Sequence, residues 1–298
     1  MVLFEIMSTM FSFTFMQRAI VVGLLVSLCA ALLGVNLVLK RYAMIGTALS
    51  HVGFASMAIM GATPLASLLT GLGLGAIAIA SIIDLAPLAI SMPVVIASAF
   101  LLLRLNENSK VKGDSAVALV STSSLAIGVI VVSATTGLTL HVCNVMFGSI
   151  FAMTQVDMYL SMALGIVVLT LFVLFYKQLF AVAYDEEFAK STGTKVEIYK
   201  SLLAILTAVT IVLGMRMMGA LLITALTLFP ALSAMRLCKR FLSVVITAAI
   251  IGVVCFFVGM IISFWLNLPP GACVVGVNLI VFFIFCIIAL IKKWGAAA

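Results

Sequence analysis

The residue with the clearest capacity for chemistry in this chain is His51, which lies in an apolar stretch of membrane length. An ionisable side chain at membrane depth is costly, so it is by default a candidate for a pathway or a binding site rather than for packing. Imidazole is also a leading ligand for borderline metals such as zinc. Thr47 and Ser50 place hydroxyl groups close to it in the sequence. The alternative is a histidine near the membrane interface that hydrogen-bonds to a neighbouring helix, and position alone leaves both interpretations open.

Three further side chains are candidate metal contacts, and one proline is a candidate break. His141 and Cys143 are two residues apart, so both could bind a soft metal on an extended backbone, although a loop histidine can equally be solvated. Asp84 is the one carboxylate at a plausible membrane depth away from the ends of the predicted spans. Pro230 should kink or break its helix and leave backbone groups that need a partner or a water-lined cavity.

The composition places these residues in an integral membrane protein. The chain is 65% hydrophobic and 8% charged, and its mean hydropathy is +1.41. No strand-length alternation of apolar and polar residues is present, so the expected fold class is all-α, a polytopic helical bundle. The start of the chain lacks a basic segment and a small-residue cleavage site, so we expect no removable signal peptide. The six cysteines are scattered and are interpreted as packing residues.

The hydropathy pattern predicts about nine spanning helices in a single transmembrane domain, residues 1–298. The predicted spans are 17–39, 45–64, 86–103, 115–135, 157–178, 200–215, 218–235, 241–265 and 272–291. Fourteen of the sixteen basic residues fall in five clusters that alternate spans place on one side of the membrane, leaving Arg18 and Arg216 on the other. Such clusters are typically cytoplasmic, which predicts an external N-terminus and a cytoplasmic C-terminus. The net charge of +7 therefore orients the chain and does not indicate nucleic-acid binding.

Residues 65–84 do not fit this alternation. They are apolar enough to form another span, yet one more crossing would place Lys110 and Lys112 outside. Pro64 and Pro87 bracket the stretch. We expect a re-entrant or surface-lying helix here, or one very long tilted element.

The hydrophilic segment 184–195 predicts a short capped helix. Its acidic residues precede a lysine, as the helix dipole favours, and Gly193 can close the helix in left-handed geometry. Such a segment is either a solvated connector or an element that docks a partner on the cytoplasmic face, and the pattern alone favours neither.

Several kinds of catalytic motif are absent from the sequence. There is no G-x-x-x-x-G-K-S/T phosphate loop, no H-E-x-x-H and no G-x-S-x-G. A proton- or sodium-driven carrier would usually bury more carboxylates than this chain offers. The sequence therefore predicts a protein that is not an enzyme by itself, and whose energy for moving a solute comes from a partner.

Six segments stand out when they are taken in order: Leu39–His51, Lys112–Ala116, Met146–Ile150, Asp185–Ala189 with Gly193, Leu221–Ala231 and Leu268–Gly271. Together they resemble the motifs of bacterial zinc/manganese/iron ABC-transporter permeases, and the resemblance covers about residues 17–290.

The resemblance implies a permease subunit in the bacterial cytoplasmic membrane that pairs with a second copy. Two ATPase subunits would dock from the cytosol and hydrolyse ATP, and an external metal-binding protein would deliver the ion. No cofactor would be bound permanently; the cargo, zinc first and manganese second, would bind transiently. The segment 185–193 would be the coupling helix, with Asp185, Glu186, Glu187, Phe188, Ala189 and Gly193 as its motif residues. Phe147, Gly148, Ser149 and Pro230 are then candidates for a kink or gate in the pathway.

The chain departs from the family pattern at the expected metal contacts. His51 matches the family's histidine, but Thr47 stands where the family has an aspartate one helical turn earlier. A hydroxyl lacks the negative charge that attracts a divalent ion most strongly in a low-dielectric pathway. His141 occupies a position where relatives often carry an acid, and the stretch around Asp84 is additional to the family layout. The protein therefore either rebuilds its site from Asp84, His141 or Cys143, or binds metal more loosely.

Two other functions remain open at this point. One is a secondary carrier or channel for metal ions that works without an ATPase. The other is an ABC permease for iron-siderophore or cobalamin-type cargo, which would need a wide apolar cavity and would not need His51.

Overall fold

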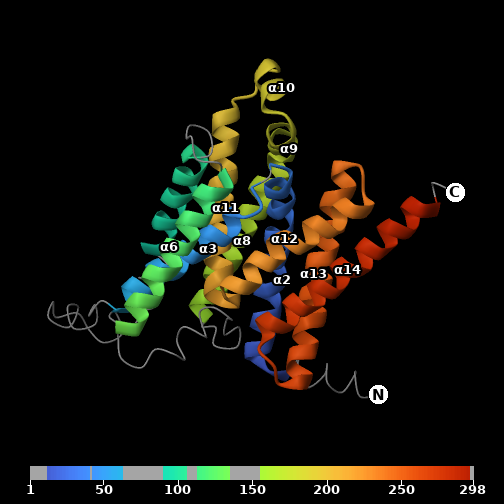
Figure 1. Ribbon diagram of the computed structural model, residues 1–298. Helices are drawn as coiled ribbons and strands as arrows, with labels where there is room; N and C mark the ends of the chain where they lie inside the picture. The colour runs from blue at the N-terminus through green and yellow to red at the C-terminus, as the bar shows by residue number, and fades with distance from the viewer. Residues whose placement is uncertain (1–11, 41, 63–89, 106–112, 135–154, 296–298) are drawn as a thin grey trace.

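The computed structural model describes residues 12–40, 42–62, 90–105, 113–134 and 155–295 (Figure 1). All regular structure in these ranges is helical, which confirms the predicted fold class. The helices are α2 (Thr14–Leu39), α3 (Ile45–Ala62), an unlabelled helix (Ile90–Leu105), α6 (Gly113–Ala134), α8 (Gln155–Leu174), α9 (Tyr176–Tyr184), α10 (Glu186–Ser191), α11 (Val196–Met218), α12 (Ala220–Leu237), α13 (Phe241–Leu266) and α14 (Pro270–Gly295).

Seven of the helices in the described ranges are long and apolar enough to cross a membrane, so the protein is a multi-pass membrane protein. Two more apolar helices, Ile45–Met60 and Ile90–Leu105, are shorter. They coincide with the predicted spans 45–64 and 86–103, but their length does not confirm the expected count of about nine crossings. The predicted extra element at 65–84 lies outside the described residues.

Helix α2 lies at the centre of the bundle, and most of its residues are buried against neighbouring helices. It packs against α12, α13, α8 and α11. The last helix, α14, has the opposite character: its outer face leaves large apolar side chains exposed, as expected of a lipid-facing helix, including Ile280, Phe283, Ile287 and Ile291.

Glycines allow the central helices to approach closely. A Cβ atom added at Gly34 of α2 would lie 1.9 Å from the backbone carbonyl oxygen of Thr227 in α12. A Cβ at Gly23 would lie 2.0 Å from the ring of Phe256, which is fully buried. Small residues at such crossings let membrane helices gain van der Waals contact along the backbone.

Helix α12 continues through Pro230, so the expected alternative of a broken helix is wrong. Proline removes one N–H donor, which leaves the carbonyl of Leu226 without its usual helical hydrogen bond. The Pro230 ring is buried, and its Cγ atom lies near Gly252 of α13. Packing against α13 therefore stabilises a helix that a proline would otherwise weaken.

The short helix predicted in the segment 184–195 is present as α10, at the upper end of the molecule in Figure 1. The Asp185 carboxylate caps it by accepting hydrogen bonds from the backbone N–H groups of Glu187 and Phe188, both at 3.0 Å. Gly193 ends the turn at φ = 81°, as predicted. We call this end of the bundle the α10 end.

The opposite end carries an ion pair between α11 and α8. Arg216 lies in the last turn of α11, and its Nη2 atom is 2.7 Å from Oδ1 of Asp157 near the start of α8. Both side chains are largely buried, so the pair is shielded from solvent. It fixes the spacing between these two helices at this end.

Candidate functional site

His51 lies in the second turn of α3 and faces α6. Its Nδ1 atom is 2.7 Å from the hydroxyl oxygen of Ser121, and the ring is half-buried. The hydrogen bond to a neighbouring helix, which the alternative interpretation of His51 predicted, is therefore present. In the tautomer whose Nδ1–H donates to Ser121, the lone pair on Nε2 is available to a metal.

The two hydroxyls named with His51 occupy different surroundings. Thr47 is half-buried and lies one turn before His51 on the same face of α3. Ser50 is fully buried, and its hydroxyl donates to the carbonyl of Gly46 at 2.9 Å. Of the two, Thr47 therefore shares the histidine's face, whereas Ser50 is turned into the helix packing.

The other predicted contacts cannot be placed beside His51. Asp84, His141 and Cys143 lie outside the described residues, as do the gate candidates Phe147, Gly148 and Ser149. In the part of the chain that the structure describes, no three side chains of the histidine, cysteine, aspartate or glutamate type gather as a metal centre would require. The described portion of the site therefore consists of one imidazole, oriented by Ser121, with the Thr47 hydroxyl on its face.

A second group of charged residues lies at the α10 end. The two carboxylate oxygens of Glu186 contact two different lysines: Oε1 is 3.0 Å from Nζ of Lys40, and Oε2 is 2.5 Å from Nζ of Lys200. Lys40 follows the last turn of α2, and Lys200 lies in the second turn of α11. The lysine side chains are only 5% and 8% exposed, so these ion pairs are largely shielded from water. We call Lys40, Glu186 and Lys200 the clamp.

The clamp determines the ionisation of Glu186. Partial burial alone would raise the pKa of this carboxyl, but the hydrogen bonds and charges of Lys200 and Lys40 outweigh burial, and the pKa lies below its usual range. Glu186 is therefore ionised wherever the protein functions near neutral pH.

This shift predicts how pH changes the contribution of Glu186 to stability. Because the pKa is lower in the folded protein, the stabilisation is fully present above the ordinary glutamate pKa of about 4.3 and is lost as the pH falls through the folded-state value. The difference in melting temperature between wild type and Glu186→Gln, measured in detergent, should stay constant from pH 8 to 5 and shrink at lower pH. A difference that already disappears above pH 5 would contradict the assignment.

The outward face of α10 differs from the face that carries the clamp. Phe188 is 63% exposed although it is a large apolar side chain, and Glu187 and Lys190 are exposed beside it. The inner face is held by Ala189, which packs with Val182 of α9 and Val196 of α11. Helix α10 thus presents one exposed apolar side chain with charged neighbours, and its opposite face packs on α9 and α11.

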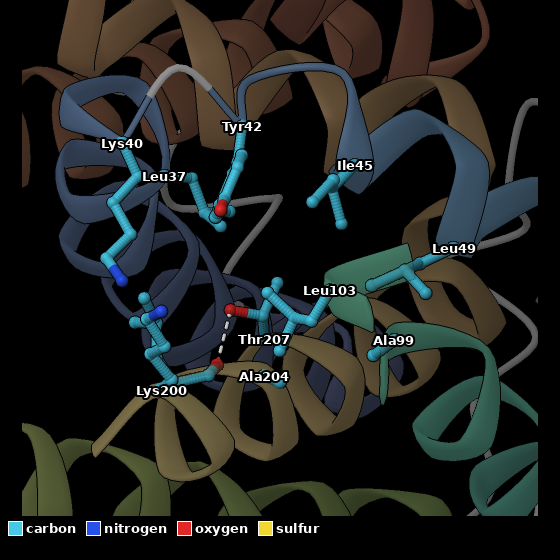
Figure 2. Close-up of a pocket in the computed structure, with 11 residues that line it drawn as sticks. Leu37, Lys40, Tyr42, Ile45, Leu49, Ala99, Leu103, Lys200, Ala204 and Thr207 are labelled. Carbon is cyan, nitrogen blue, oxygen red and sulfur yellow. Dashed lines mark hydrogen bonds between the residues drawn. The ribbon is translucent and has the colours of Figure 1, made fainter. Parts of the chain in front are cut away.

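A small cavity lies beside the clamp (Figure 2). Its volume of about 20 Å³ suits a water molecule and excludes a larger ligand. Lys40 and Lys200 flank one side, with Tyr42 and Ile45 at the start of α3 on another and Thr207 of α11 opposite them. The residues that lead into α3 therefore border a water-sized space as well as packed side chains.

Sequence analysis missed three participants in these arrangements. Lys40 falls in the first family segment and in a basic cluster, and Lys200 falls in another basic cluster, but nothing in the sequence pairs either lysine with Glu186, which is 146 residues from Lys40. Ser121 stands among several small hydroxyl residues of α6, and no pattern distinguishes it from its neighbours. The signal that could have drawn attention to Lys200 is its position as the first residue of the predicted span 200–215, where a lysine at the edge of an apolar run favours a partner.

Comparison with known proteins identifies the family. The profile of the ABC 3 transport family matches residues 12–289. An uncharacterized membrane protein in the ycf23-apcF intergenic region of Cyanophora paradoxa is 30% identical over 279 residues, which cover 93% of this chain and 87% of that protein. The manganese import system permease protein ScaB of Streptococcus gordonii is 26% identical over 287 residues, or 96% and 95% of the two chains.

A solved structure agrees with these matches in fold and sequence. PsaBC from Streptococcus pneumoniae, in complex with Fab, superposes with a TM-score of 0.77 at 26% identity and covers 94% of each chain. The resemblance drawn from the six ordered motifs is thus confirmed over nearly the whole length: the chain belongs to the ABC 3 transport family of metal-transporter permeases.

Proposed function

We propose that this chain is the membrane-spanning permease subunit of an ATP-driven importer of divalent metal ions, with manganese as the first ion to test. The observation that carries this proposal is the match to a manganese import permease over almost the full length of both chains. Zinc was the first expectation from the resemblance, but the named relatives favour manganese over zinc. His51 and Thr47 offer one nitrogen and one oxygen, a set compatible with either ion.

The proposal gives each end of the bundle a role. The α10 end carries several of the basic clusters, including Lys190, Lys195 and Lys239–Arg240, and would face the cytosol by the positive-inside tendency. The exposed Phe188 with its charged neighbours would dock an ATPase subunit there. The end with Asp157 and Arg216 would face outward and receive metal from an external binding protein.

Membership of an ABC-transporter family also supports a proposal for the subunit composition. Two copies of this chain would pair in the bacterial cytoplasmic membrane with two ATPase subunits, which hydrolyse the ATP that the permease itself cannot. The C-terminus would be cytoplasmic. His51 would contact the ion transiently as the assembly alternates between outward- and inward-open states.

The test is manganese uptake into vesicles that contain the purified permease with its cognate ATPase. We expect uptake that requires ATP, that stops with ADP, and that free divalent metal competes away more effectively than a metal chelate does. Uptake that continues without nucleotide would contradict the proposal in favour of a carrier or channel. Preferential competition by the chelate would instead indicate siderophore- or cobalamin-type cargo.

A further inference from the structure

The clamp joins α10 to parts of the chain that the backbone does not connect to it directly. The neighbours of α10 along the chain are α9 and α11, and it packs on both. Lys40, by contrast, belongs to the end of α2, 146 residues earlier. Through Glu186 the short helix is therefore tied to a membrane-spanning helix from the other half of the sequence.

From Lys40 a series of noncovalent contacts continues into α3. The Lys40 ammonium group lies 5.9 Å from the centre of the Tyr42 ring, within the range of a cation–π contact. The backbone N–H of Tyr42 donates to the carbonyl of Leu37 at 2.8 Å, and the carbonyl of Tyr42 accepts from the N–H of Ile45 at 3.0 Å. Ile45 is the first residue of α3, and His51 lies six residues further along the same helix.

The clamp is poorly explained as a device for stability alone. Burying two ammonium groups beside a carboxylate carries a desolvation cost, so such a cluster is weak evidence for stability alone, and fixing geometry is its other recognised role. The ion pairs also sit beside the small cavity lined by Lys40, Tyr42 and Ile45 (Figure 2). Ile45 is buried and Tyr42 packs on the same cluster of buried side chains, so a displacement of Tyr42 would also reach the start of α3 through packing.

We propose that Glu186 and Lys40 are positioning residues that carry the movement of α10 through Tyr42 into α3, and so to the helix that bears His51. This inference rests on the proposed function, because it assumes that an ATPase moves α10. It divides the motif of α10 into two parts: the outward face with Phe188 meets the partner, and the inward Glu186 passes the displacement on.

The test measures transported manganese per ATP hydrolysed in vesicles containing the permease–ATPase complex. Lys40→Met removes the link to α2 and α3 but leaves the Glu186–Lys200 pair intact, so α10 stays held on α11. We expect ATP hydrolysis to continue while manganese transported per ATP falls at least about fivefold. Glu186→Gln should produce the same loss. Lys40→Arg, which keeps the charge, should restore most of the ratio.

Glu197→Gln is the matched control, because Glu197 is an exposed carboxylate in the first turn of α11 at the same end of the molecule. It should leave the ratio unchanged. A wild-type ratio in Lys40→Met would overturn the inference, and so would an equal loss in Lys40→Met and Lys40→Arg. If the wild-type complex itself moves no manganese, the proposed function fails first, so the two failures are distinguishable. Should Glu186→Gln fold poorly, the two Lys40 variants still decide the question.

Discussion

Replacing His51 by alanine is expected to abolish metal transport while leaving the permease folded and able to bind its ATPase. The ring is half-buried between α3 and α6, so its loss removes the proposed ligand without opening a large cavity in the core. Removing a side chain that only orients a metal-binding residue typically lowers metal affinity or activity about ten- to a hundredfold, and removing a direct contact should cost no less. The measurement is the initial rate of ATP-dependent manganese uptake in vesicles, with melting temperature as the check on folding.

Ser121→Ala provides a graded companion to that experiment. If Ser121 orients the imidazole through the 2.7 Å hydrogen bond, its removal should lower uptake by a smaller factor than His51→Ala does.

Thr47→Asp should preserve or strengthen manganese binding, because a carboxylate supplies the charge that a hydroxyl lacks. Unchanged uptake in His51→Ala would show that the ion passes elsewhere in the protein.

Replacing Gly34 by alanine is expected to destabilise the fold strongly, although it adds a single methyl group. The added Cβ would lie 1.9 Å from the carbonyl oxygen of Thr227 and 2.8 Å from its carbonyl carbon. These are backbone atoms in the buried interior, so relief requires α2 and α12 to move apart rather than one side chain to rotate. Overpacking of this kind costs about 1–3 kcal/mol or more, enough to lower the melting temperature by several degrees or prevent monodisperse purification.

Gly276→Ala is the control for that substitution. Gly276 also lies within a long apolar helix, α14, but a Cβ there would meet no atom within 4 Å. Its melting temperature should equal that of wild type. A stable, monodisperse Gly34→Ala protein would mean that the crossing of α2 and α12 is looser than the structure places it.

Local patterns predicted most of the helices and one of their connections. Membrane-length apolar runs bounded by charge or proline can form little other than helices, so every predicted span overlaps a helix. The predicted span 157–178 is wrong at its end, because it runs across the break between α8 and α9 at Phe175. The sequence Asp185 to Gly193 carries its own cap and its own left-handed stop, so α10 was predictable as well. Crossing numbers are harder, because helix length and hydropathy at the ends of Ile45–Met60 and Ile90–Leu105 do not settle where the membrane begins.

The candidate site was predicted only in part, because long-range contacts leave no local signal. His51 could be found from its chemistry alone, as an ionisable group in an apolar run. Ser121 could not, because what distinguishes it from Thr122 and Ser123 is that α3 lies against it; the hydroxyls of those two bond to their own helix instead. Lys200 faces Glu186 only once α10 has folded back onto α11.

The two ion-paired positions on α11 limit how that helix can move. Lys200 and Arg216 are sixteen residues apart, or about 24 Å along the helix axis. Each is held by a carboxylate from a different segment, Glu186 at one end and Asp157 at the other. Sliding α11 along its axis would stretch both attachments together, whereas tilting it about one end preserves the attachment there. Helix α11 is thus held by an ion pair near each end. Tilting it about one of these ion pairs breaks only the other pair, whereas translation along the axis breaks both.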